Sequence, residues 1–94
     1  DSGVSGRVSG AMAELLRRLA EHRQVFCVTH QPLVAAAADH HFRVAKQVLD
    51  GTTHTRVSQL RDTQARQAEL VELAGGDSGE ARRYAASLLE REAG

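Results

Sequence analysis

His30 is the residue whose type and place in the chain could most readily do chemistry. It follows residues 25–28, where four apolar residues stand in a row rather than alternating with polar ones. Such a run predicts a short strand over residues 24–29, buried on both faces as in a parallel sheet covered by helices. Ligands of open α/β sheets bind at the carboxyl ends of the strands. A neutral imidazole there can donate a hydrogen bond to a phosphate oxygen or a catalytic water, or it can simply end the strand.

The opening segment is a second candidate, because Asp1 stands close to Gly3 and Gly6. A carboxylate beside flexible glycines suits a loop that approaches a ligand or a partner, although a plain surface turn has the same composition. The residues alone predict a loop over 1–6 and leave both readings open.

The remaining chemistry-bearing residues point to no metal site. His40 and His41, with Asp39 and His54, could suggest a metal site, but adjacent residues of a strand face opposite sides, so His40 and His41 cannot easily share one ion. No Cys or His pair has zinc-finger spacing. Cys27 is the single cysteine, so it forms no internal disulfide, and its place in the apolar run predicts a small buried hydrophobe.

Two helices should position the candidate strand. The first is expected from residue 5 or 6 to 22, with one apolar stripe formed by Val8, Met12, Leu15, Leu16 and Leu19. Gly10 lies inside it and costs roughly 1 kcal/mol against Ala, which favours close packing against a neighbour. Pro32 suits the first turn of a second, shorter helix that runs through residues 34–38.

The second half of the chain predicts a hairpin and two further helices. Alternating residues over 42–60 flank Asp50-Gly51, a strong two-residue turn signal. Asp62 can cap a helix that runs to residue 74, where Gly75-Gly76 ends it. Residues 77–80 have capping-box spacing, and the apolar positions that follow over 81–89 predict the last helix.

Composition narrows the class of protein. The 94 residues carry twelve basic and twelve acidic side chains and are 41% apolar. A net charge of zero gives no electrostatic reason to bind nucleic acid by itself. No apolar run reaches membrane-spanning length and no signal peptide is recognisable, so a cytoplasmic location is expected. A strand buried on both faces needs neighbours that the hairpin cannot supply, and we expect them in sequence that precedes Asp1.

Several short blocks, in the same order, resemble the end of an ABC-type ATPase head, and within that superfamily the RecN family of bacterial DNA repair proteins, which is related to the SMC proteins. The blocks are residues 1–6 (D-x-G-V-S-G), 29–35 (T-H-x-P-x-x-A), 38–46 (A-D-H-H-F-R-V-A-K), 66–70 (R-Q-x-E-L) and 73–76 (L-A-G-G).

The resemblance implies an α/β fold that is the C-terminal part of an ABC-type (P-loop) ATPase head, with a parallel strand, a β-hairpin and flanking helices. Residues 1–94 would form the C-terminal lobe, divided into a D-loop (1–6), a switch-histidine loop (29–32), a hairpin (42–60) and C-terminal helices (62–92). The resemblance further implies that His30 contacts the γ-phosphate of ATP and helps to hold the attacking water. Asp1, Ser2 and Gly3 would face the partner subunit across the shared nucleotide.

The implied function is ATP hydrolysis by an SMC-like protein in DNA double-strand-break repair and recombination. The implied ligands are ATP and Mg²⁺, bound mainly by residues outside this chain, and the implied partners are a second head in a homodimer and DNA through the full-length protein, with no membrane. The location would be the bacterial cytoplasm, at the nucleoid. Since the Walker A, signature and Walker B motifs are absent, the chain alone should be inactive. Two alternatives stay open: a non-catalytic α/β interaction module, and the head of another SMC-like ATPase such as a RecF-like protein.

Overall fold

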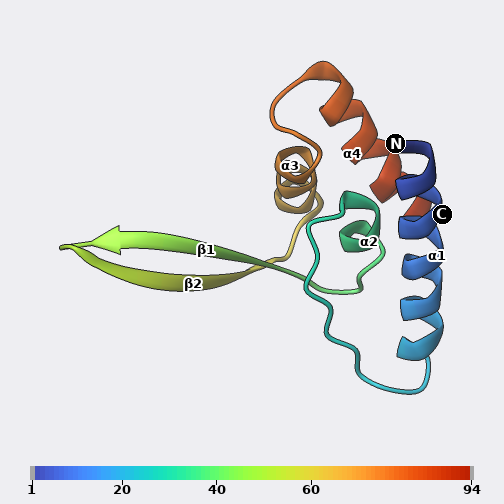
Figure 1. The fold of residues 1–94 in the computed structure, drawn as a ribbon, viewed down its shortest axis with the longest axis horizontal. Helices are drawn as coiled ribbons and strands as arrows, with labels where there is room; N and C mark the ends of the chain where they lie inside the picture. Colours follow the sequence, from blue (N-terminus) through green and yellow to red (C-terminus); the bar gives the residue numbers. More distant parts are fainter. Residues whose placement is uncertain (1, 94) are drawn as a thin grey trace.

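The computed structural model describes the backbone of residues 2–93 and the side chains of residues 6–92. Its helices form one body, from which a two-stranded hairpin projects (Figure 1). The elements in chain order are α1 (Ser2–Ala20), α2 (Pro32–Ala36), β1 (His41–Leu49), β2 (Thr52–Leu60), α3 (Thr63–Leu73) and α4 (Gly79–Ala93).

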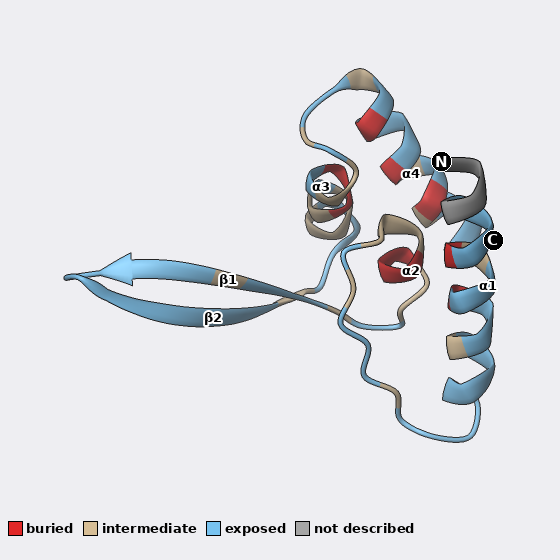
Figure 2. Cartoon of the chain, in the orientation of Figure 1, coloured by how far each residue is buried: buried red, intermediate tan, exposed pale blue. Residues whose placement is uncertain are grey.

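A small core lies where α2, α3 and α4 meet. Leu70 of α3 and Ala85 of α4 are fully buried, and Ala36 of α2 is nearly so. Figure 2 shows the buried residues gathered on the facing sides of the helices. Because alanines supply much of this core, the helices can approach closely, and α2 fits between its neighbours despite its five residues.

Helix α1 begins earlier than the sequence predicted. It starts at Ser2, so the loop expected over residues 1–6 is wrong for residues 2–6, while Asp1 lies outside the described residues. Ser and Gly each cost about 1 kcal/mol or less against Ala in a helix, and each residue added to an existing helix gains a hydrogen bond. The long helix that follows can therefore extend through this segment.

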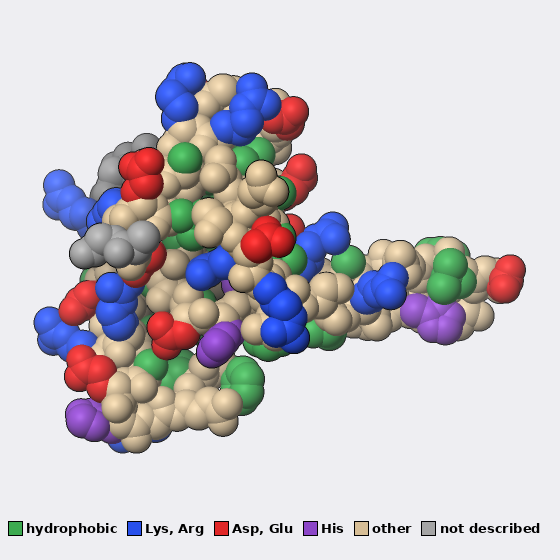
Figure 3. Space-filling view, turned by 180° about the vertical axis from the view of Figure 1, so that it is seen from behind, with side chains coloured by type: hydrophobic (Ala, Val, Ile, Leu, Met, Phe, Trp, Pro, Cys, Tyr) green, Lys and Arg blue, Asp and Glu red, His purple; other side chains and the backbone are tan. Residues whose placement is uncertain are grey.

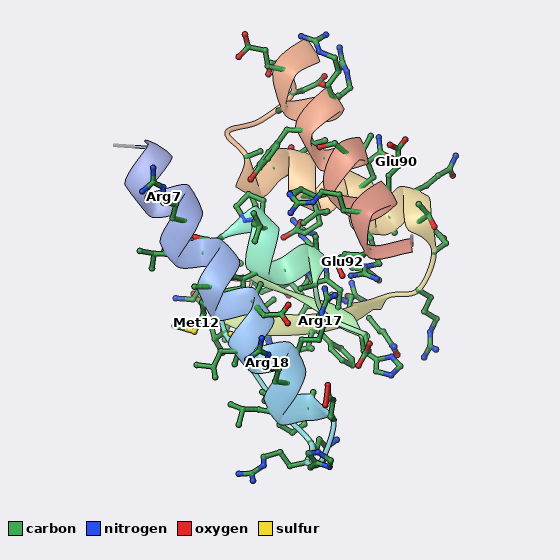
Figure 4. The ribbon with its side chains drawn as sticks, turned by 90° about the vertical axis from the view of Figure 1, so that its right-hand side faces the viewer. Arg7, Met12, Arg17, Arg18, Glu90 and Glu92 are labelled. Atoms are coloured by element: carbon green, nitrogen blue, oxygen red, sulfur yellow. The ribbon has the colours of Figure 1, made fainter. Side chains whose placement is uncertain are left out.

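The apolar stripe predicted on α1 does not face the core. Val8, Met12, Leu15 and Leu19 are exposed, whereas Ser9 and Ala13 are buried on the side that faces α2. Figure 4 shows Met12 pointing away from the other helices. The expected close packing at Gly10 is also wrong, because a Cβ there would have no atom within 4 Å.

An ion pair connects the C-terminal part of α1 to α4, the last helix of the chain. Arg17 of α1 forms an ion pair with Glu92 of α4, and the two side chains point toward one another in Figure 4. Arg18 pairs with Glu14 on its own helix, 3.4 Å away. Arg17 and Arg18 are thus each paired with an acid on the solvated surface.

The parallel strand expected over residues 24–29 is not formed. Among residues 2–93 the sheet contains only β1 and β2, and the segment before His30 has no regular secondary structure and no strand partner. Phe26 is 83% exposed, and Val28 and Cys27 are also exposed, so Cys27 is not the buried hydrophobe expected. A strand needs a neighbour for its backbone N–H and C=O groups, and no described segment lies where it could pair with this one.

The hairpin confirms the alternating pattern. β1 and β2 are antiparallel and paired without a bulge from His41 opposite Leu60 to Leu49 opposite Thr52. Asp50 and Gly51 turn the chain with φ of 51° and 76°, the positive values that a type I′ turn requires. Most hairpin side chains are exposed, because only its base approaches the helical body (Figures 1 and 2).

Both ends of α3 follow the predicted local signals. Asp62 caps α3 by accepting a hydrogen bond from the N–H of Ala65 at 2.7 Å. After α3, the N–H of Gly76 reaches the carbonyl of Val71 and that of Gly75 reaches the carbonyl of Glu72, which is a Schellman motif. The capping box predicted over residues 77–80 is wrong for α4: Ser78 is the N-cap and accepts from the N–H of Ala81, whereas Asp77 pairs with Arg82.

No helix within residues 2–93 combines the length and the apolar character that crossing a membrane requires.

Candidate functional site around His30

His30 lies two residues before α2, with its imidazole exposed to solvent. The N–H of Gln31 donates to Oγ1 of Thr29 at 3.0 Å, a local turn that orders the backbone on both sides of the histidine. Pro32 then opens α2 at its first position, where a missing N–H is tolerated. The predicted block Thr-His-x-Pro therefore leads directly into α2, although no strand precedes it within the described residues.

A chain of side-chain hydrogen bonds joins His30 to α1. Ser9 Oγ donates to Oε1 of Gln31 at 3.4 Å, and the amide Nε2 of Gln31 lies 3.3 Å from Nε2 of His30. An amide nitrogen only donates, so this contact is a hydrogen bond in the tautomer in which Nε2 of the imidazole accepts and Nδ1 carries the proton. The ring can then offer a neutral N–H donor to an incoming group.

A cavity of about 390 Å³ lies beside this hydrogen-bonded chain, between α1, α2 and the α3–α4 connection. It brings together three blocks that are far apart in the sequence: the first turns of α1, the segment after His30, and the residues around Gly75. The lining residues are Gly6, Ser9, Gln31, Pro32, Leu33, Leu73, Ala74, Gly75 and Tyr84. Figure 3 shows the molecule from behind the view of Figure 1, and on that face charged side chains of both signs are interspersed over the helices.

A second polar group holds the other end of α2. Arg66 of α3 donates to carbonyls at the C-terminal end of α2, and the same guanidinium lies near His41 at the start of β1. Burial, and then the positive charge of Arg66, lower the pKa of His41 from its ordinary value of 6.5. His41 is therefore kept neutral in the folded protein.

The other predicted candidates are not brought to His30 in the described structure. Asp1 lies outside the described residues, and Ser2 and Gly3 are described only as the first residues of α1. Within residues 2–93, no three His, Cys, Asp or Glu side chains come close enough to hold a metal ion.

The side chains present fit one contact to a nucleotide phosphate rather than a complete site. The imidazole of His30 supplies one neutral donor. The sequence contains no Gly-rich loop followed by Lys and Ser or Thr, which is what cradles phosphates in P-loop proteins. ATP with Mg²⁺ would therefore need most of its ligands from elsewhere.

Sequence reasoning missed Ser9, Gln31 and Arg66. Ser9 carried a weak signal, since it is a polar residue one position from the apolar stripe on a helix that must bury one face. Arg66 stood in one of the resemblance blocks without an assigned role. Their partners lie 22 to 31 residues away in the sequence, so no local pattern identifies them.

Comparison with known proteins identifies the family. No protein-family model matches the chain. Among curated proteins, the chain is similar to the DNA repair protein RecN of Synechocystis sp., with 44% identity over 99% of the chain, and to that of Xylella fastidiosa, with 42% over 96%. The DNA repair protein RecN of Bacillus subtilis is 46% identical over 81% of the chain.

The chain spans 18%, 16% and 13% of the length of these three relatives. The sequence alone left a RecN head and a RecF-like head open, and the agreement of these three relatives decides in favour of RecN. The chain belongs to the RecN family.

Proposed function

We propose that this chain is part of an SMC-like ATPase that acts in DNA double-strand-break repair and recombination, and that it contributes to a P-loop head. In this proposal His30 contacts the γ-phosphate of ATP bound between two heads of a homodimer. Asp1, Ser2 and Gly3 would face the second head. The names of the relatives support the repair role, and the resemblance of residues 1–6 and 29–35 to the family's blocks supports the two site assignments.

The observation that best supports a role for His30 is the hydrogen-bonded chain from Ser9 through Gln31. It links the histidine to the helix whose first residues are the proposed D-loop, and it holds the imidazole exposed with one N–H free to donate.

The chemistry that His30 can supply is positioning and charge stabilisation. Phosphoryl transfer depends mainly on alignment of the attacking water and on stabilising charge on the phosphoryl oxygens. A neutral N–H donor placed at a γ-phosphate oxygen stabilises that charge without adding a proton to the nucleotide. Bound Mg²⁺ would neutralise further charge, with ligands outside the described residues, and DNA would be contacted through other parts of the full-length protein.

The test uses a chimaera in which this chain replaces the matching segment of the full-length Synechocystis relative. His30→Ala should lower the kcat of ATP hydrolysis by roughly 10²-fold, the typical effect of losing one preorganised donor. The Kd of a non-hydrolysable ATP analogue should stay within about threefold, because the other phosphate ligands remain.

The matched control is His54→Ala, which removes an exposed imidazole from the hairpin. It should leave kcat within twofold of the parent chimaera. Turnover by His30→Ala equal to that of the parent would remove His30 from the site. The 94-residue chain alone should hydrolyse no ATP.

A second candidate function, an interaction module without catalysis, is favoured by the exposed apolar stripe on α1. It predicts that His30→Ala leaves turnover of the chimaera unchanged, while charged substitutions at Met12 or Leu15 abolish a binding event. The two candidates therefore give opposite results for His30→Ala.

A further inference from the structure

Arg66 makes a three-fold contact with the end of α2. Its Nη2 lies 3.0 Å from the carbonyl oxygen of Ala38, 3.3 Å from that of Ala36 and 3.5 Å from that of Ala35. These carbonyls belong to the last residues of α2 and the turn after it, where a helix leaves acceptors without intrahelical partners. A cation at this end also interacts favourably with the helix dipole.

Helix α2 depends on such contacts because it is short. A helix of five residues gains too few backbone hydrogen bonds to be stable in isolation, so its position must come from tertiary contacts. Its apolar residues pack in the core, and polar contacts at both of its ends add to that packing. Arg66 fixes the C-terminal end, as the bond from Ser9 to Gln31 fixes the N-terminal end.

The same face of α3 also holds the base of the hairpin. Glu69 lies one turn after Arg66, and its carboxylate is 3.1 Å from Nε of Arg43 on β1. The block Arg66-Gln67-x-Glu69 thus has a structural reading: the first residue binds the end of α2 and the last binds β1.

The guanidinium of Arg66 contacts backbone carbonyls rather than an acidic side chain. Among the described residues no carboxylate forms an ion pair with Arg66, and its buried Nε has no hydrogen-bond partner. Arg66 is half-buried, and a partly desolvated cation without a counter-ion is costly, so its retention here is better explained by what it holds in place than by ion-pair stability.

We propose that Arg66 is a positioning residue for His30: by binding the C-terminal carbonyls of α2 it fixes the helix that begins two residues after the histidine, and so fixes where the imidazole meets a nucleotide. This inference rests on the proposed function of His30. It assigns to α3 a part in hydrolysis although α3 contributes no group that touches ATP.

The experiment uses the same chimaera with Arg66→Met and Arg66→Lys. Met keeps much of the side-chain volume but has no donor, and Lys keeps the charge but loses the planar fork that can reach several carbonyls. Asp62→Ala is the matched control, because it removes the N-cap of the same helix, about 1 kcal/mol, and does not touch α2.

Arg66→Met should lower kcat about tenfold with the KM for ATP within twofold, and Arg66→Lys should fall between Met and the parent. Amide hydrogen exchange of the peptide that covers residues 29–38 should become at least tenfold faster in Arg66→Met. Asp62→Ala should leave both kcat and this exchange within twofold of the parent, even if it lowers the melting temperature as much as Arg66→Met does.

A double variant separates positioning from general stability. If Arg66 acts through His30, adding Arg66→Met to His30→Ala should lower kcat by less than twofold further. A further tenfold loss in the double variant would overturn the inference, as would a kcat of Arg66→Met within twofold of the parent while His30→Ala is impaired. Unchanged turnover by His30→Ala would instead show that the proposed function itself is wrong.

Discussion

Ser9 on α1 donates a hydrogen bond to Gln31, the residue that follows His30, across 22 positions of the chain. Ser9 is only 8% exposed, and its hydroxyl is placed against the one side chain that also contacts the imidazole. A buried hydroxyl needs a partner, and the choice of partner connects the first helix of the chain to the candidate site.

Removing the hydroxyl of Ser9 should lower the rate of ATP hydrolysis and leave nucleotide binding nearly unchanged. A net hydrogen bond contributes about 0.5–1.5 kcal/mol, so Ser9→Ala in the chimaera should lower kcat by roughly two- to tenfold, with nucleotide affinity close to that of the parent. Steady-state kinetics measures this directly. Ser87→Ala is the control, since that exposed hydroxyl bonds only to the carbonyl of Tyr84 on its own helix, and it should have no effect. Equal kinetics for the two variants would contradict the role of Ser9.

Stability of the 94-residue chain should fall on acidification through the titration of His41. Burial and the charge of Arg66 lower the pKa of His41 below 6.5, so the folded state stays neutral at a pH where the unfolded state takes up a proton. The unfolded state therefore binds more protons, and the free energy of unfolding decreases as the pH falls through 6.5 toward the lower folded value. Urea unfolding at pH 7.5 and 5.5 measures the change.

The substitution that isolates this effect is His41→Gln, which cannot titrate. It should lose less stability than the parent between pH 7.5 and 5.5, whereas His54→Gln, on the exposed part of the hairpin, should lose as much as the parent. A parent-like pH dependence in His41→Gln would mean that other groups carry the acid sensitivity.

Two glycines should respond to alanine in opposite directions. Gly10 lies inside α1 with open space where a Cβ would stand, so Gly10→Ala should stabilise the chain by about 0.5–1 kcal/mol. Gly76 has φ of 102° in the Schellman motif, a conformation that strains any side chain, so Gly76→Ala should destabilise it by at least about 1 kcal/mol. Thermal or urea unfolding of both variants provides the comparison, and shifts of the same sign would show that the backbone at one position differs from that described.

The exposed apolar stripe of α1 should make the 94-residue chain self-associate. The accessible surface is 7196 Å², against about 5,300 Å² expected for a compact monomer of 10.2 kDa. Leu15 is 53% exposed and Met12 46% exposed on one helical face, and fully burying such a side chain contributes about 1.5–3 kcal/mol. Sedimentation velocity should therefore show oligomers that the double variant Met12→Gln/Leu15→Gln converts largely to monomer.

The control for this prediction is Ser87→Gln, which places the same side chain on α4, away from the stripe. It should leave the sedimentation profile unchanged. If the double variant sediments like the parent, association occurs through another surface, such as the exposed apolar side chains Phe42, Val44 and Val48 of the hairpin.

Much of the local structure follows from the sequence because its causes are local. Asp50-Gly51 dictates the hairpin turn, Asp62 the start of α3, and Gly75-Gly76 its end, since each depends on the conformation of residues within about four positions. The family, and with it the interest in His30, also comes from short blocks that can be read along the chain.

The tertiary structure alone decided which apolar residues are covered and what holds the histidine. Residues 24–29 have the composition of a buried strand, but a strand exists only where a neighbour accepts and donates its backbone hydrogen bonds, and none of the described segments does so. Helix α1 likewise buries Ser9 and Ala13 rather than its most apolar side, because the face that meets α2 is chosen by packing. The contacts from Ser9 to Gln31 and from Arg66 to Ala38 join residues 22 and 28 positions apart, so only folding could bring them together around His30.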